Sequence, residues 1–109
     1  MDALTPLTYS ILVALADAPR HGYGIIKEIE ARTGAGTAPS TGALYLALQR
    51  MEAEGSIEEA RKRPASDDAR SRYWALTRRG REAARVESRR LAAVLAAARK
   101  KDLLAGDPA

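Results

Sequence analysis

The amino-acid sequence predicts a mainly α-helical chain that carries one small β-hairpin and a long C-terminal helix. Apolar residues recur at helical spacing in three segments within residues 1–55, and glycine or proline ends each segment. Two short strand-like segments, 56–63 and 70–76, then flank a run of turn-forming residues. From residue 77 the helical pattern returns and continues almost to the end of the 109 residues. This order predicts one domain with an appended helix.

The first helix is expected to begin just after Thr5, whose hydroxyl can accept a hydrogen bond from a backbone N–H of the first turn. Pro6 suits an early helical position because the N–H that it lacks would be unpaired there. A turn that ends in Pro19 stops the helix. Its apolar positions are Leu7, Ile11, Ala14 and Leu15.

The second helix is expected after a tight turn at Gly22 and should stop at Gly34, because glycine tolerates a left-handed backbone. Residues 35–39 predict a loop, since proline and the neighbouring glycines discourage regular structure. The third helix should take Ser40 as its cap and end at Gly55.

The segments 56–63 and 70–76 predict a β-hairpin whose long loop contains Pro64 and two aspartates. Thr77 should then cap a long helix that runs to about Leu104. Along this helix, small and apolar residues alternate in steps of four and three, which is the spacing of a helix–helix interface.

A chain of this size has a small core that cannot cover such a helix along its whole length, so we expect a homodimer. Residues 1–76 should form the globular unit, and residues 77–109 a dimerisation helix and tail. The residues expected at the interface between subunits are Leu4, Leu7, Ala84, Ser88, Leu91, Val94, Leu95 and Ala98.

The formal net charge of +4 conceals an uneven distribution. Residues 1–60 hold four basic and eight acidic side chains, whereas residues 61–101 hold fourteen basic and four acidic ones. Such an asymmetry favours a polyanionic partner for the second half of the chain. A solvated, arginine-rich helix would give the same composition, and composition alone does not separate the two.

The third helix has two unlike faces. With about 100° per residue, Leu44, Leu48 and Met51 form the stripe that should face the core. The opposite side is small and almost uncharged in its N-terminal half, so its backbone can approach another molecule closely. That side carries Gly42, Leu46, Gln49 and Ala53, with Ala43 and Arg50 beside them and Tyr45 at the border.

A third helix of this kind, following a short second one, is typical of a helix-turn-helix unit whose second element enters the DNA major groove. Gln49 can pair with adenine, Arg50 with guanine or a phosphate, and Leu46 can contact a thymine methyl group. Ser40 and Thr41 lie where the N-terminus of a helix can bind a phosphate. Alternatively, the apolar side chains of this face pack against another segment or a second subunit.

The hairpin is expected to act as a wing that contacts the phosphate backbone of DNA. Asp67 and Asp68 at the tip of its loop favour a backbone contact over insertion into the minor groove. Tyr73, Trp74 and Leu76 are expected in the core or an interface. The basic residues of the wing are Arg61, Lys62, Arg63, Arg70 and Arg72.

Four segments, taken in order, resemble the PadR family of winged-helix transcriptional regulators over about residues 4–85. The first two are His-Gly-Tyr at 21–23 and the Leu-Tyr pair with its following leucine in the third helix. The others are the Glu-Gly turn at 54–55 and Tyr-x-x-Leu-Thr-x-x-Gly at 73–80.

This resemblance implies a winged helix-turn-helix with a long C-terminal dimerisation helix. It also implies a dimeric repressor that binds a pseudo-palindromic operator in double-stranded DNA and is relieved by a small-molecule effector. By position, it assigns Tyr45, Gln49 and Arg50 to the helix that contacts bases, and 61–63 to the wing. It places Tyr23 at the start of the second helix, whose amides can face a phosphate.

The sequence departs from the family pattern in two places. Thr41, Gly42, Ala43 and Leu46 occupy positions where the family usually has Pro-Gly-Thr and a later proline, which changes the detail of base contacts rather than the fold. The last helix has no aromatic residue. A pocket between subunits would therefore be lined by leucine, valine and alanine, and we do not expect planar aromatic ligands to stack there.

An enzyme is not expected. The chain has no cysteine and a single histidine, His21, so neither a histidine-based triad nor a metal cluster can assemble within one chain. Residues 22–24 do not begin a dinucleotide-binding loop, because Lys27 replaces its last glycine and no strand is predicted before them. No cofactor or metal is expected, and the acidic side chains at 52–59 should form a solvated surface.

No signal peptide is recognisable, and no apolar stretch approaches the roughly 20 residues that a membrane span needs. We therefore expect a cytoplasmic protein without a membrane partner. Two other functions stay open. A protein-interaction module on a winged-helix scaffold would use Leu46 and Tyr45 as a partner surface, and a non-specific nucleoid-binding protein would bind every DNA fragment with similar affinity.

Overall fold

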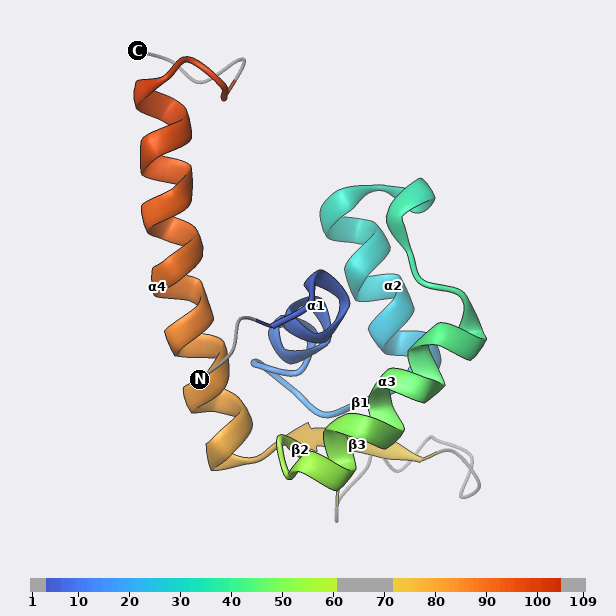
Figure 1. Ribbon diagram of the computed structural model, residues 1–109. Coiled ribbons are helices and arrows are strands. Elements are labelled where there is room, and N and C mark those ends of the chain that lie inside the picture. Colours follow the sequence, from blue (N-terminus) through green and yellow to red (C-terminus); the bar gives the residue numbers. More distant parts are fainter. Residues whose placement is uncertain (1–3, 61–71, 105–109) are drawn as a thin grey trace.

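Three helices and a three-stranded sheet pack together in the computed structural model, and a fourth helix projects from them (Figure 1). The structure describes residues 4–60 and 72–104. The elements in chain order are α1 (Pro6–Ala14), β1 (Arg20–His21), α2 (Gly22–Thr33), the 3₁₀ helix η1 (Ala35–Thr37), α3 (Thr41–Glu54), β2 (Ile57–Glu59), β3 (Tyr73–Leu76) and α4 (Arg78–Lys100). The predicted helical fold with a small hairpin is confirmed.

Side-chain caps begin α1, α3 and α4 as predicted. In each case a hydroxyl oxygen accepts a hydrogen bond of 3.0–3.2 Å from the backbone N–H three residues later, and the capping residues are Thr5, Ser40 and Thr77. A cap that the sequence pattern did not predict begins α2, where Nδ1 of His21 accepts a hydrogen bond of 2.9 Å from the Gly24 N–H. These caps pair N–H groups that would otherwise lack partners.

The helix ends agree with the glycine signals but differ in detail near the C-terminus. Gly34 and Gly55 follow α2 and α3 with φ angles of 98° and 82°, as predicted. The loop expected after Gly34 contains one turn of 3₁₀ helix. The last helix stops at Lys100, because Asp102 takes a left-handed backbone (φ 61°) and Leu103 N–H donates to Ala98 carbonyl at 2.8 Å.

The sheet has the order β1-β3-β2, and both pairings are antiparallel. Strands β2 and β3 form the predicted hairpin, in which Ile57 lies opposite Leu76 and Glu59 lies opposite Trp74. Strand β1 was not predicted, because it is only two residues long and exists through its pairing with β3. This third strand fixes the start of α2 against the hairpin.

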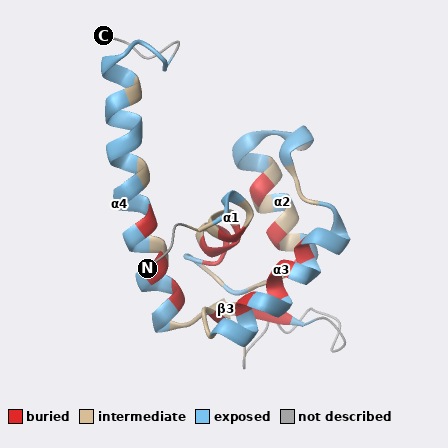
Figure 2. Ribbon diagram, in the orientation of Figure 1, coloured by how far each residue is buried: buried red, intermediate tan, exposed pale blue. Residues whose placement is uncertain are grey.

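The core lies where α1, α2 and α3 meet above the sheet (Figure 2). The predicted stripe of α3, formed by Leu44, Leu48 and Met51, is buried. Tyr73 and Trp74 of β3 are buried too, as predicted for core residues. The largest side chains with almost no exposed surface are Ile11, Leu12, Ile25, Leu44, Leu48, Met51 and Ile57.

Helix α4 packs against α1 and β3 only in its first half, and its second half extends away from the globular unit (Figure 1). The radius of gyration is therefore 15.4 Å, whereas a compact chain of this length would have about 13 Å. Within residues 4–60 and 72–104, no helix combines the length and the apolar character that crossing a lipid bilayer requires.

Candidate nucleic-acid interface

The side of α3 that faces away from the core is uncovered. We call it the reading face, and it consists of Thr41, Gly42, Tyr45, Leu46, Gln49 and Arg50, all of which are exposed. Leu46 exposes 70% of its surface and Tyr45 exposes 51%. A Cβ added to Gly42 would meet nothing within 4 Å. The described part of the chain therefore leaves this side of α3 open to another macromolecule.

Tyr45 connects the reading face to the start of α2. A Cβ built on Gly22 would lie 2.5 Å from the Tyr45 hydroxyl oxygen, so the tyrosine ring occupies the space that a larger residue would need. Tyr23, the next residue of α2, is 62% exposed. The structure thus brings the first turn of α2 and the middle of α3 together, as a helix-turn-helix unit requires.

A positive charge accompanies Tyr23. The ammonium group of Lys27 lies 5.2 Å from the centre of the Tyr23 ring, within reach of a cation–π contact. A hydrogen bond with Tyr23 raises the pKa of Lys27 above its ordinary value, and nearby Glu30 acts in the same direction. The Lys27 ammonium also lies 3.9 Å from a Glu30 carboxylate oxygen, so its charge is partly compensated within α2.

The opposite end of α3 is acidic. Glu52, Glu54, Glu58 and Glu59 are all exposed, as predicted for a solvated surface. Because carboxylates repel phosphates, the end of α3 from Glu52 onward is electrostatically unsuited to a nucleic-acid backbone. The cap places Ser40 at the other, N-terminal end, where its hydroxyl oxygen accepts the Ala43 N–H at 3.1 Å.

Most of the predicted wing lies outside the described residues, and this includes Arg61, Lys62, Arg63 and Arg70. Arg72 is described, and its guanidinium group is already engaged. It lies 3.4 Å from a Glu59 carboxylate oxygen and 3.9 Å from one of Glu52. The sequence did not predict these two ion pairs, because Glu59 and Glu52 lie 13 and 20 positions before Arg72. Pairing of β2 with β3 is needed to bring the charges together.

The predicted dimer residues fall into two groups. Leu4, Leu7 and Ala84 are half-buried against the core of their own chain. Val94 and Leu95, in the projecting half of α4, are 53% and 51% exposed. Helical geometry puts Gly80, Ala83 and Glu87 on the same side of α4 as Leu91, Leu95 and Ala98. This stripe is buried as far as Glu87, half-buried at Leu91 and Ala98, and exposed at Leu95. Figure 2 shows the buried part in the first half of α4.

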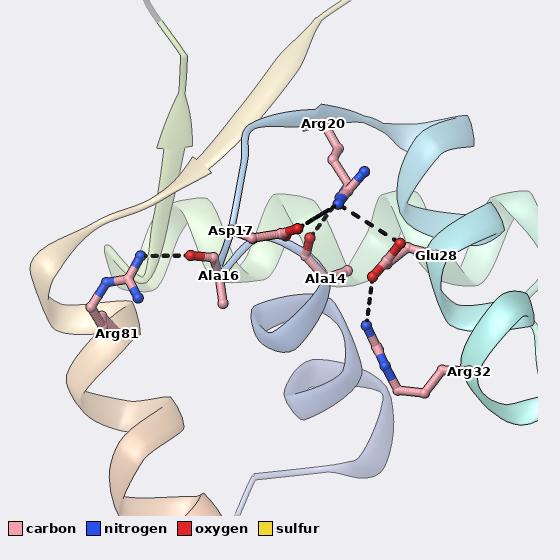
Figure 3. A network of polar contacts seen from close by, with 7 residues as sticks. All are labelled: Ala14, Ala16, Asp17, Arg20, Glu28, Arg32 and Arg81. Atoms are coloured by element: carbon pink, nitrogen blue, oxygen red, sulfur yellow. Dashed lines mark hydrogen bonds and ion pairs between the residues drawn. The ribbon is translucent and has the colours of Figure 1, made fainter.

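Three polar contacts attach α4 to the N-terminal segment. The hydroxyls of Tyr9 and Ser88 share a hydrogen bond of 2.7 Å. Arg81 donates to the Ala16 carbonyl at 3.0 Å, which Figure 3 shows at the end of α1. The carboxylate of Glu87, which is buried, accepts the Leu4 N–H at 3.5 Å. Sequence reasoning did not find these pairs, because their partners lie 65 to 83 positions apart.

A further network, drawn in Figure 3, fixes α1 to α2. Arg20 Nε donates to the Ala14 carbonyl at 2.7 Å, and its guanidinium pairs with Asp17 at 3.1 Å and Glu28 at 3.7 Å. The hydrogen bond from Arg20 lowers the pKa of the Asp17 carboxyl. Because Arg20 also belongs to β1, the network positions the strand that precedes the helix-turn-helix unit.

Comparison with known proteins agrees with this geometry. Residues 11–86 match the model of the transcriptional regulator PadR-like family. Over 82 residues, or 75% of its length, the chain is 40% identical to an uncharacterized 37.1 kDa protein in transposon TN4556 of Streptomyces fradiae. The chain spans only 22% of the length of that curated relative.

Solved structures share the fold. A PadR family transcription regulator from Clostridium difficile superposes with a TM-score of 0.76 at 23% identity, over 88% of this chain and 97% of the other. Bacillus subtilis PadR, solved in complex with operator DNA, superposes with a TM-score of 0.60 at 23% identity, over 72% of this chain and 44% of the other. The predicted winged helix-turn-helix is confirmed, and the chain belongs to the PadR-like family of transcriptional regulators.

Proposed function

We propose that this protein is a homodimeric, sequence-specific DNA-binding repressor that a small-molecule effector releases from its operator. The reading face carries this proposal. The side of α3 that faces the core is fully buried, whereas Leu46 and Tyr45 on the other side are exposed. The chain also belongs to a family of transcriptional regulators. The Bacillus subtilis relative bound to operator DNA supports the same use of the fold here.

In this proposal α3 lies in the major groove and the wing contacts phosphates. Gln49 pairs with an adenine edge, Leu46 contacts a thymine methyl group, and Arg50 contacts guanine or a phosphate. Ser40 and Thr41 hold a phosphate at the start of α3. The acidic residues 52–59 keep the C-terminal end of the helix away from the backbone.

Dimerisation through residues 77–109 is supported by the stripe on α4. Leu91, Val94, Leu95 and Ala98 continue the face that packs on the core in the first half of the helix, so a second chain supplies the missing cover. Two copies related by a twofold axis present two reading faces, and we expect a pseudo-palindromic operator with half-sites about 10 bp apart or a small multiple of that spacing.

Effector relief is supported by an open hollow between α1 and α4. It has a volume of about 460 Å³, in the range of small-molecule sites. Val13, Ala16 and Ala84 supply its apolar lining, and Arg81 and Ser88, which also bond to the N-terminal segment, lie at its edge. A ligand there would alter the angle between the globular unit and the dimerisation helix.

The deciding experiment is selection of genomic fragments on the purified protein, followed by binding measurements on the enriched sequence and on random DNA. We expect one enriched, pseudo-palindromic motif. Gln49→Ala should relax the preference at one base pair per half-site, by about 1–3 kcal/mol. Equal loss on operator and random DNA would reject Gln49 as a base-contacting residue.

The same selection tests the alternatives. A nucleoid-binding protein would enrich no motif and would bind all fragments with similar affinity. A protein-interaction module would bind none. The effector is found by screening small molecules for release of a labelled operator. Its binding in the α1–α4 hollow should be weakened by Ala84→Leu, which narrows the hollow.

A further inference from the structure

The guanidinium group of Arg72 is held on three sides. Its central carbon lies 4.5 Å from the centre of the Trp74 ring, which is the geometry of a cation–π contact. Its Nη2 atom lies 3.4 Å from Glu59 on β2 and 3.9 Å from Glu52 on α3. We call these four residues the Arg72 cluster. It joins the hairpin to the helix that carries the reading face.

The cluster borders a hollow of about 330 Å³ beside the reading face. Tyr45 and Gln49 line this hollow together with Leu48, Glu52, Arg72 and Trp74. Gln49 is one helical turn from Glu52 and one from Tyr45, so all three point to the same side of α3. Arg72 therefore stands in the wall of the space that borders Gln49, although it belongs to the hairpin.

The charge of Arg72 is compensated within the protein. Two carboxylates face one guanidinium, so the three charged groups together carry a net charge of −1. A phosphate that paired with Arg72 would compete with both carboxylates for the N–H groups of a side chain that is 56% exposed. An arginine whose charge is partly compensated gains less from a phosphate than an unpaired one does, and this argues against a phosphate contact as the main role of Arg72.

We propose that Arg72 is a positioning residue for base recognition rather than a phosphate contact. It fixes β3 and Trp74 against Glu52 of α3, and this holds Gln49 in the orientation that reaches a base edge. The role depends on the planar guanidinium, which stacks on the indole while its N–H groups face two carboxylates. Lysine keeps the charge but cannot make this arrangement. The inference rests on the proposed function.

The test compares Arg72→Lys and Arg72→Gln with the wild type in two assays. The first measures affinity for the selected operator and for random DNA at several salt concentrations. The second measures acrylamide quenching of Trp74, which is the only tryptophan of the chain and reports the cluster without DNA. Arg50→Gln is the matched control, because Arg50 is an exposed arginine at the reading face.

Arg72→Lys should lower the preference for operator over random DNA by about fivefold or more, the lower end of what one base contact supplies. Its log–log salt slope should equal that of the wild type, and quenching of Trp74 should increase. Arg72→Gln should behave in the same way. Arg50→Gln should leave Trp74 quenching unchanged and reduce the salt slope by about 0.9 if it contacts a phosphate.

Two results would overturn the inference. One is an Arg72→Lys variant with wild-type preference and wild-type quenching. The other is an Arg72→Gln variant whose salt slope falls by about 0.9 while quenching stays constant, which is the behaviour of a phosphate contact. If the wild type bound no DNA, the proposed function would fail, and the quenching assay alone would still decide whether Arg72 shields Trp74.

Discussion

The hydroxyl groups of Tyr9 and Ser88 lie 2.7 Å apart and share a hydrogen bond that joins α1 to α4. Together with the contact from Arg81 to Ala16 it attaches the projecting helix to the unit that carries the reading face. In a dimer built on α4, such contacts set the angle between the two reading faces. If the proposed dimer binds two half-sites, we expect these hydroxyl and carbonyl groups to influence their spacing.

Removing this link should loosen the preferred half-site spacing. Tyr9→Phe keeps the ring and deletes one hydrogen bond, so we expect the free energy of unfolding to fall by no more than about 1 kcal/mol. The ability to discriminate between operators whose half-site spacings differ by one base pair should fall by more than the stability does. Binding curves on operators with different half-site spacings measure this discrimination. A variant as strict as the wild type would show that the Tyr9–Ser88 hydrogen bond does not set the angle between α1 and α4.

The apolar stripe in the second half of α4 should be required for dimerisation. Leu91→Asp with Leu95→Asp places two charges where an apolar partner surface is expected, and it should give monomers in analytical ultracentrifugation and abolish operator binding. Ala93→Asp with Ala96→Asp makes the same change on the opposite face of the helix and should remain dimeric. If the first variant stayed dimeric, or if its monomer bound the operator, dimerisation through α4 would be rejected.

Gly80 should tolerate no side chain. A Cβ at this position would lie 2.0 Å from the Ser56 carbonyl oxygen and 2.9 Å from its carbon, and both belong to the backbone. Gly80→Ala must therefore push α4 away from the turn after α3, at a cost of about 1–3 kcal/mol or more. Chemical denaturation measures the loss.

Gly42→Ala is the control for this substitution, since a Cβ there meets nothing within 4 Å. It should leave the free energy of unfolding unchanged or raise it by about 0.4–1 kcal/mol, because alanine restricts the unfolded chain. Equal losses for both variants would mean that the contact with Ser56 does not determine the effect.

Stability should depend on pH through Glu87. A hydrogen bond from Arg90 holds the pKa of this carboxyl below its ordinary value of 4.5, against the opposing effect of its burial. Because the folded state prefers the ionised form, this stabilisation is complete above pH 4.5 and is lost as the pH falls through the lowered pKa. The difference in unfolding free energy between wild type and Glu87→Gln should therefore shrink below pH 4.5.

Glu82→Gln provides the comparison for that measurement. Glu82 is exposed, and its ion pairs with Arg85 and Arg89 are 4.0 and 3.9 Å long. Exposed pairs of this kind contribute little, so this variant should follow the pH profile of the wild type. A Glu87→Gln profile that also followed the wild type would show that the pair with Arg90 has no influence on folding.

Local signals predicted the helices well. Thr5, Ser40 and Thr77 act as caps because the bond from a hydroxyl to an N–H three residues later depends only on nearby sequence. The buried and open faces of α3 followed from helical spacing in the same way. His21, in contrast, was identified as part of a family motif, and its role as the cap of α2 became visible only from the position of Nδ1.

Long-range features were not predictable from the same information. Strand β1 has two residues, and its pairing with Tyr73 and Trp74 spans more than 50 positions. Arg72 was predicted to contact the phosphate backbone of DNA because it is basic and lies in the wing. In the folded chain it pairs with Glu52 and Glu59 instead. Hydrophobic spacing indicates which residues are buried, but it does not say which charges meet after folding.

The short strands at both edges of the sheet have a consequence for assembly. Among the residues that the structure describes, β1 offers two residues and β2 three, and β3 is paired on both sides between them. Edges this short are poor templates for a strand from another molecule. Within residues 4–60 and 72–104, the helices therefore offer better surfaces for self-association than the strands do.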